Sequence, residues 1–147
     1  MAQTGSITLF LRHSNEYLDF PQLLNAFNGK DSWIIGYNNR LAYLPLNDED
    51  FCWVHTDKSM LDDILQLLIQ KYNYGEIVGF FASYLATNIA IEVLIYPYTS
   101  KITFGIYVNR KTINNFDVTD FSWYLDKILP IFVRLNIVIE SIECIDG

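Results

Sequence analysis

Two histidines, two cysteines and several carboxylates are the residues of this sequence that could carry catalytic chemistry. His55 lies three residues after Cys52 and two before Asp57, so this segment offers a nucleophile, a base and an orienting acid. In an extended chain, however, side chains three residues apart point to opposite faces, so Cys52 does not meet His55 locally. His13 has no such neighbours and is expected to end the first strand.

No metal or cofactor motif accompanies these residues. Neither histidine has the His-x-x-x-His spacing of a metal site, and the cysteines form no Cys-x-x-Cys pair. The acidic run at 47–50 lacks the alternating ligands and the glycine of a calcium loop, and the glycines at 75 and 79 lack the Gly-Lys-Ser/Thr ending of a phosphate loop. We therefore expect no cofactor and no metal, although an enzyme with a non-local site around His55 and Asp57 stays open as an alternative.

Acidic and aromatic residues alternate in two segments, and these are the candidate partner-binding residues. The first segment contains Asp48, Glu49, Asp50, Trp53 and Asp57; the second contains Asp117, Asp120 and Trp123. In a binding interface, carboxylates steer a basic partner inward while aromatic rings anchor it with little entropy to lose. The alternative interpretation is that the aromatics belong to the core and the acids to the solvated side of the same elements.

The charge balance narrows the choice of partner. The formal net charge is -7 and the pI is about 4.6. Binding nucleic acid requires clustered Lys and Arg, and anionic membrane surfaces also attract cations. The composition therefore predicts a basic protein partner rather than nucleic acid or a membrane.

The chain is long and apolar enough to fold without disulfides or metals. It has 147 residues, of which 51% are hydrophobic, and no linker or repeat divides it, so we expect one globular domain over residues 1–147. This apolar surplus also suits a structural or assembly subunit with a permanent hydrophobic interface, including a homodimer.

The expected address is the cytoplasm. The first residues contain no basic region followed by a long apolar run, so a secretory signal is not predicted. Residues 77–98 are long enough to span a bilayer, but their alternation and Glu92, which has no obvious partner, favour two core strands. Cys52 and Cys144 are expected to be reduced, buried and structural.

Hydrophobic periodicity predicts the elements that position these residues. Strands are expected at 6–12, 33–37, 41–46, 51–54, 76–84, 89–96, 102–109 and 137–145, with Asn38-Asn39 forming a hairpin turn. Helices are expected at 16–27, at 59–72 capped by Ser59, and at 119–135 capped by Thr119, the last kinked or ended early by Pro130. The order β-α-β-β-β-α-β-β-β-α-β predicts an α+β fold, with a mainly antiparallel sheet of about six to eight strands and two or three helices on one face.

In size, acidity, single-domain build and lack of a catalytic motif, the chain resembles the immunity proteins of bacterial toxin systems. Nuclease toxins must be basic to hold nucleic acid, so their inhibitors are suitably acidic. The sequence therefore predicts an acidic protein-binding inhibitor, an immunity protein that neutralises a basic, nuclease-like toxin domain by direct binding.

Overall fold

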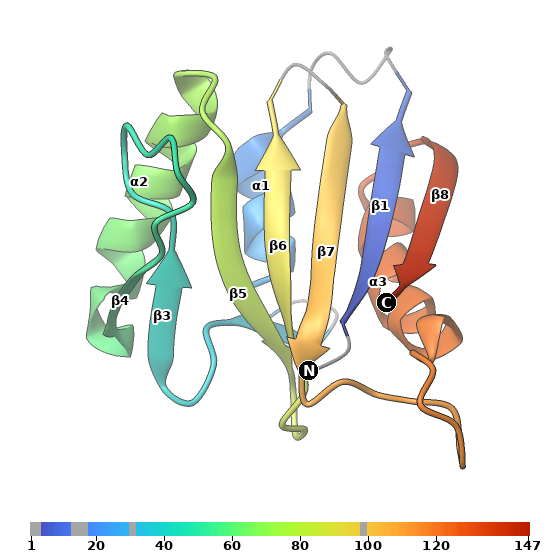
Figure 1. Cartoon of the computed structure of the whole chain (residues 1–147). Coiled ribbons are helices and arrows are strands. Elements are labelled where there is room, and N and C mark those ends of the chain that lie inside the picture. The colour runs from blue at the N-terminus through green and yellow to red at the C-terminus, as the bar shows by residue number, and fades with distance from the viewer. Residues whose placement is uncertain (1–3, 13–17, 30–31, 98–99) are drawn as a thin grey trace.

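One antiparallel sheet of eight strands forms the centre of the fold (Figure 1). The computed structural model describes residues 4–12, 18–29, 32–97 and 100–147. The strands are β1 (Gly5–Leu11), β2 (Trp33–Ile35), β3 (Arg40–Tyr43), β4 (Val54–Asp57), β5 (Val78–Tyr84), β6 (Ala90–Tyr96), β7 (Lys101–Val108) and β8 (Ile139–Asp146). Their order is β4-β3-β5-β6-β7-β1-β8, with β2 paired to β5 beside β3.

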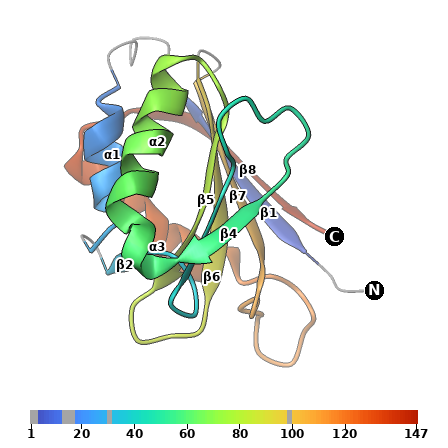
Figure 2. The ribbon, with the colours of Figure 1, turned by 90° about the vertical axis from the view of Figure 1, so that its left-hand side faces the viewer.

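Three helices cover one face of this sheet and leave the other face bare (Figure 2). They are α1 (Phe20–Ala26), α2 (Leu61–Asn73) and α3 (Phe121–Arg134), and a single 3-10 turn, η1 (Lys58–Met60), leads into α2. The predicted α+β class and the predicted order of elements are both confirmed. Antiparallel hairpins dominate because most of the connections between strands are too short for a crossover helix.

The core lies between the helices and the inner side of the sheet. Alternate strand residues such as Ile7, Phe80 and Phe104 point inward and are fully or almost fully buried. From the helices, Leu68 and Phe132 meet them and are equally buried. Burial of each such side chain contributes roughly 1.5–3 kcal/mol to the free energy of folding, so the fold does not depend on disulfides or metals.

The predicted turn at Asn38-Asn39 is present, but the hairpin around it is not. Asn38 and Asn39 adopt φ angles of 52° and 60°, the left-handed conformation that Asn tolerates. Only the bridge between Tyr37 and Arg40 joins the two sides. The flanking strands instead both pair with β5, because register along a longer neighbour outweighs a two-residue turn.

The capping residues before α2 and α3 differ from the predicted ones by two and by one position. The carboxylate of Asp57, not Ser59, caps the turn before α2 by accepting from the Ser59 amide at 2.9 Å. Asp120 rather than Thr119 caps α3, because the Thr119 hydroxyl is turned to Asp146 at 2.6 Å. Pro130 lies inside α3, which continues to Arg134, close to the predicted end at 135; of the two effects predicted for Pro130, a kink or an early end, the early end is wrong.

Other boundaries move for local reasons. The predicted strand at 51–54 begins only at Val54, because Phe51 has a φ of 54° that no strand accepts. The first helix begins at Phe20 with Asp19 as its cap. The beginning of its predicted range, and His13, lie outside the described residues.

The two thiols are free, as predicted, but both are exposed, so the prediction of burial is wrong. Cys52 lies in the loop before β4, and Cys144 lies on β8 at the edge of the sheet. Cys144 is exposed because an edge strand exposes even the side that faces the helices.

Candidate functional site

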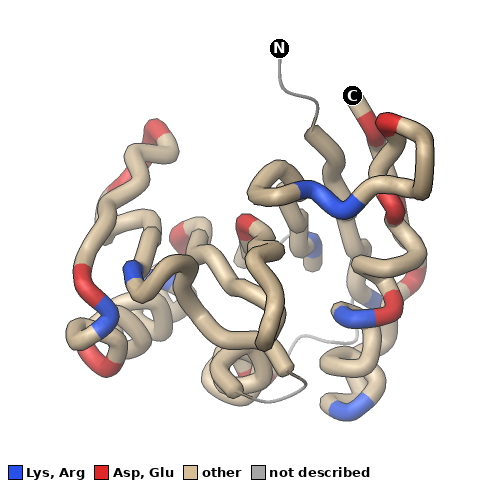
Figure 3. The backbone as a smooth tube through the Cα atoms, turned by 90° about the horizontal axis from the view of Figure 1, so that it is seen from below, with Lys and Arg blue, Asp and Glu red and all other residues tan. Residues whose placement is uncertain are grey.

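The face of the sheet that no helix covers is bordered by two projecting loops (Figures 1 and 2). One connects β3 to β4 and contains Asp48, Glu49 and Asp50, and the other connects β7 to α3 and contains Asp117. Seen from below, acidic residues lie at the tip of the projecting segment on one side and beside the C-terminus on the other (Figure 3). The two candidate segments of the sequence therefore flank one surface from opposite ends.

A buried lysine anchors the acidic loop. Lys71 of α2 is almost fully buried, and its amine donates to the carbonyl of Pro45 at 2.5 Å and lies 3.5 Å from a Glu76 carboxylate oxygen. The same oxygen accepts from the Asn47 amide at 2.8 Å, and Asp48 accepts from the Cys52 amide at 2.9 Å. The loop is thus fixed from within. Burial lowers the pKa of the Lys71 amine, and the neighbouring Glu76 carboxylate partly opposes that shift.

The three acids of the loop differ in their exposure and contacts. Asp48 is partly buried and engaged in the loop, whereas Glu49 and Asp50 are exposed. Glu49 and Asp50 are therefore the charges available to a partner.

Trp53 lies over the bare face as a half-buried ring. Its centroid is 5.0 Å from that of Phe81 in an edge-on arrangement, and its outer edge reaches the space above Gly79. It is therefore part of an aromatic surface layer, neither fully in the core nor free in the loop. A partner pressed on this face would contact a ring whose position is already set.

His55 and Asp57 point outward from the edge strand β4, where both are exposed. A hydrogen bond from the backbone of Ser59 holds the pKa of Asp57 below its usual range, so this carboxylate is a weak base. His55 borders a small hollow of about 110 Å³ together with Arg40 and Phe81. Among the described residues, no hydrogen bond links His55 to Cys52 or Asp57: the Cys52 amide donates to Asp48, and Asp57 accepts from Ser59.

The second loop is braced by Arg110. Its guanidinium is about nine-tenths buried; it forms an ion pair with Asp117, donates to the Thr119 hydroxyl at 2.8 Å, and lies 3.5 Å from Asp146. Thr119 donates to Asp146 through both its hydroxyl and its amide, and these bonds hold the pKa of that carboxyl below its ordinary value. Arg110 and Thr119 therefore connect this loop to Asp146 of the last strand, β8.

The tip of this loop is apolar and exposed. Ile113, Phe116 and Val118 are 46%, 66% and 43% exposed, and a hydrogen bond from the Ile113 amide to the Val118 carbonyl closes the turn at 2.9 Å. Exposed apolar side chains on a fixed backbone lose little entropy on binding. Asp117, beside them, is largely neutralised by Arg110.

Asp120 and Trp123 do not belong to this surface. Asp120 caps α3 by accepting from the Trp123 amide at 3.1 Å. The Trp123 ring packs edge-on against Tyr84 and Tyr124, at centroid distances of 5.5 and 4.9 Å. For these two residues the alternative interpretation, a structural role, describes the contacts better.

Sequence reasoning missed the pair at the middle of the bare face, Glu92 and Tyr107. The Tyr107 hydroxyl donates to Glu92 Oε2 at 2.8 Å, and the Tyr107 ring lies edge-on to Phe81 with centroids 6.0 Å apart. Burial, and then the Glu92 carboxylate, raise the pKa of Tyr107 far above its usual range. A lone charge within an apolar strand was the only signal in the sequence, and it did not reveal its partner 15 residues further on.

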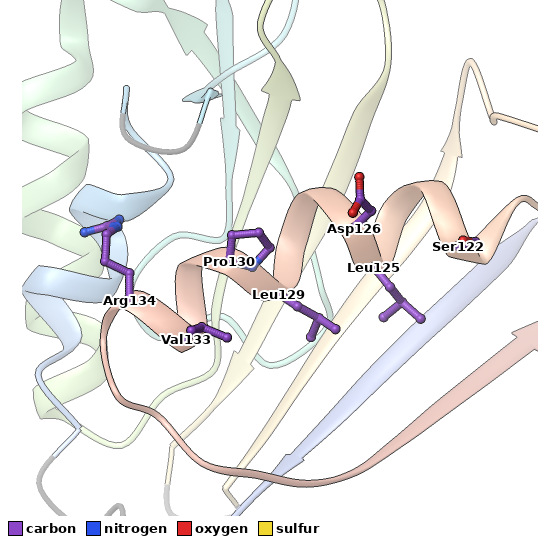
Figure 4. Close-up of a pocket in the computed structure, with 7 residues that line it drawn as sticks. All are labelled: Ser122, Leu125, Asp126, Leu129, Pro130, Val133 and Arg134. Atoms are coloured by element: carbon purple, nitrogen blue, oxygen red, sulfur yellow. The ribbon is translucent and has the colours of Figure 1, made fainter.

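A second apolar surface runs along α3, whose lining side chains are drawn in Figure 4, and continues to β8. A shallow hollow of about 810 Å³ is lined by Ser122, Leu125, Asp126, Leu129, Pro130, Val133 and Arg134. A neighbouring hollow of about 520 Å³ shares Leu129 and Val133 and extends to Ile142 of β8. Val133 is 74% exposed and Ile142 is 41% exposed, so this surface is apolar but separate from the bare face.

Comparison with known protein families, curated proteins and solved structures finds no match for this chain. Within the described ranges, no group of three or more His, Cys, Asp or Glu residues could hold a metal ion. Nor is any helix of the described part long and apolar enough to cross a membrane.

Proposed function

We propose that this chain is an acidic binding protein that neutralises a basic protein partner, as the immunity protein of a nuclease-like toxin does. The observation that carries the proposal is the bare face of the sheet, set between one acidic loop and one braced apolar loop. A basic surface would be attracted by the charge and then held by the exposed rings and aliphatic side chains.

Three features support binding over chemistry at this face. The exposed acids Glu49 and Asp50 stand on a loop fixed by Lys71, so their charge is presented without an ordering cost. The net charge of -7 adds attraction at long range. The carboxylate of Asp57, the orienting acid of the enzyme alternative, accepts from the Ser59 amide at 2.9 Å.

The test begins with capture of proteins from a lysate of the source cells and identification of what binds. The purified candidate must be basic, must bind in a defined ratio, and must lose its own activity when this chain is added. A captured protein that is acidic, or whose activity is unaffected, would contradict the proposal.

Association kinetics then test the docking face. Replacing Glu49 with Gln and Asp50 with Asn should slow association roughly tenfold at low salt and flatten its salt dependence, because these exposed charges attract a basic partner at long range and salt of about 0.1 M screens that attraction beyond about 10 Å. Asp48 is left in place because it holds the Cys52 amide. Replacing Asp62 and Asp63 with Asn removes the same charge from α2, behind the sheet, and should have a smaller effect.

The α3–β8 surface favours a second candidate function, that of an assembly subunit. Its exposed Val133 and Ile142 resemble the apolar centre of a permanent interface. Light scattering should then report a dimer or larger particle at micromolar concentration, and Val133→Asp should dissociate it. A monomer at all accessible concentrations would remove this candidate.

A further inference from the structure

We propose that Glu92, set among the aromatic side chains of the bare face, receives an arginine side chain of the partner. The inference rests on the proposed function and adds the chemical group that is recognised. The proposed site is centred on Glu92 of β6 and does not include the acidic residues of the loops.

Glu92 occupies the middle of the bare face. It lies on β6, with Phe81 of β5 on one side and Gly105 of β7 on the other, and Gly105 in turn faces Ser6 of β1. Its side chain is partly buried, although no helix covers this side of the sheet. A carboxylate here is shielded from bulk water more than those of Glu49, Asp50 and Asp117, which are exposed.

The Glu92 carboxylate is already positioned. Oε2 accepts from the Tyr107 hydroxyl at 2.8 Å, and the side chain lies against Gly105 so closely that a Cβ there would be 3.3 Å from Oε1. Within the described part of the chain, Oε1 has no hydrogen-bond donor of its own. An incoming donor therefore finds an oriented acceptor and pays little to order it.

The surroundings favour a guanidinium over an ammonium group. Phe81 and Tyr107 stand edge-on to one another at 6.0 Å, and Trp53 adds a third ring 5.0 Å from Phe81. A guanidinium is planar, stacks on such rings, forms several hydrogen bonds to a carboxylate and is less strongly hydrated than a lysine amine. A partly shielded site with one free acceptor and aromatic neighbours matches those properties.

One cation of the chain on this face, Lys101, is engaged elsewhere. The Lys101 amine lies 4.3 Å from the centre of the Tyr96 ring. Lys101 pairs with Tyr96 across β6 and β7, whereas Glu92 pairs with Gly105 further along the same two strands. Within the described ranges, no ion pair engages Glu92, so its carboxylate is left for a group from outside.

The experiment uses two small probes, N-acetyl-L-argininamide and N-acetyl-L-lysinamide, titrated into the full chain labelled with nitrogen-15. We expect saturable shifts of the amides of Glu92, Gly105 and Tyr107 with the arginine probe. The lysine probe should bind at least about fivefold more weakly, because the rings favour a guanidinium by roughly 1 kcal/mol or more.

Two variants alter the site and one serves as control. Glu92→Gln should weaken the arginine probe roughly tenfold or more, the loss expected for a charge-assisted hydrogen bond. Gly105→Ala keeps the charge but displaces the carboxylate, and should also weaken binding. Glu143→Gln removes an exposed carboxylate from β8 and should leave binding unchanged, while melting curves verify that all three variants are folded.

Equal binding of the two probes, unaltered binding to folded Glu92→Gln, or shifts confined to other surfaces would each overturn the inference. Its failure is distinguishable from failure of the proposed function. A basic partner whose affinity is insensitive to Glu92→Gln would remove the arginine site alone. Arginine binding at Glu92 without any basic partner would leave the site and remove the inhibitor function.

Discussion

Thr119 and Asp146 are joined by two hydrogen bonds, from the hydroxyl at 2.6 Å and from the amide at 3.0 Å, which tie the start of α3 to the last strand. These bonds are the main reason that the pKa of Asp146 is lowered. Arg110 contributes a further attraction from 3.5 Å.

Thr119→Val should therefore raise the pKa of Asp146 toward its ordinary value of 3.8, as followed by carbon-13 NMR of the carboxyl group. Because the folded pKa is lowered, the associated stability is full above the unfolded value and is lost as the pH falls through the folded one. The variant should lose less of its stability in this acid range than the parent protein does. An unaltered Asp146 titration would contradict this.

Tyr107 should resist ionisation in alkali. Its pKa is raised first by burial and then by Glu92, so the stability it contributes is full below about pH 10, the ordinary value, and fades as the pH rises further. Glu92→Gln should lower the pKa of Tyr107 without returning it to 10, because burial remains. Carbon-13 NMR of the phenol carbon measures this, with Tyr107→Phe to assign the signal.

Trp53→Ala should cost about 2 kcal/mol of unfolding free energy, below the roughly 3–5 kcal/mol expected for a fully buried tryptophan, because the ring is only half buried. Urea unfolding measures the loss. Val133→Ala, at a side chain 74% exposed, is the control and should change stability by less than about 0.5 kcal/mol. A loss at Trp53 as small as that at Val133 would show that its packing on Phe81 contributes nothing.

Glu76→Gln should destabilise the protein more than Lys71→Met does. The first change leaves the buried Lys71 amine without its carboxylate, at a cost of roughly 2 kcal/mol, whereas the second removes the charge that burial disfavours. Both variants should speed amide exchange at Asn47, because its amide donates to the same Glu76 oxygen that lies beside the Lys71 amine. If Lys71→Met were the less stable of the two variants, the proposed role of the Lys71–Glu76 pair in the loop would be wrong.

Both thiols should react with Ellman's reagent in the native protein, since Cys52 and Cys144 are exposed. Cys144 should react more slowly than Cys52, because partial burial raises the pKa of its thiol and leaves less thiolate. Cys144→Ser identifies the slow phase, and denaturant should bring the two rates together. If only one thiol reacted in the native state, the exposure of both cysteines would be contradicted.

The fold could be predicted from the sequence because each element carries its own periodic signal. The alternation in β6 and β7 and the apolar stripe of α2 identify their types from local residues alone. The caps could not be assigned as reliably, since Asp57 and Ser59, or Thr119 and Asp120, are equally suitable by composition. For α3 the choice depends on Asp146, 27 positions further along the chain, which holds the Thr119 hydroxyl.

The candidate site was predicted only in part, for the same reason. The acids at 48–50 indicate a loop, but the sequence does not show that Lys71, which fixes this loop through the Pro45 carbonyl, reaches it from a helix. Glu92 looked unpartnered because its hydrogen-bond donor is on the next strand. Contacts that join strands are set by register, which local patterns do not encode.

The placement of β1 has a consequence for how the molecule forms. The first strand of the chain lies between β7 and β8, and its Thr8 meets Thr103, which is 95 positions further along the sequence. A growing chain on the ribosome therefore carries β1 unpaired until most of the protein has been made. Since contacts of such long range close slowly, folding times of roughly milliseconds to seconds are expected, with an unprotected strand available to chaperones in the meantime.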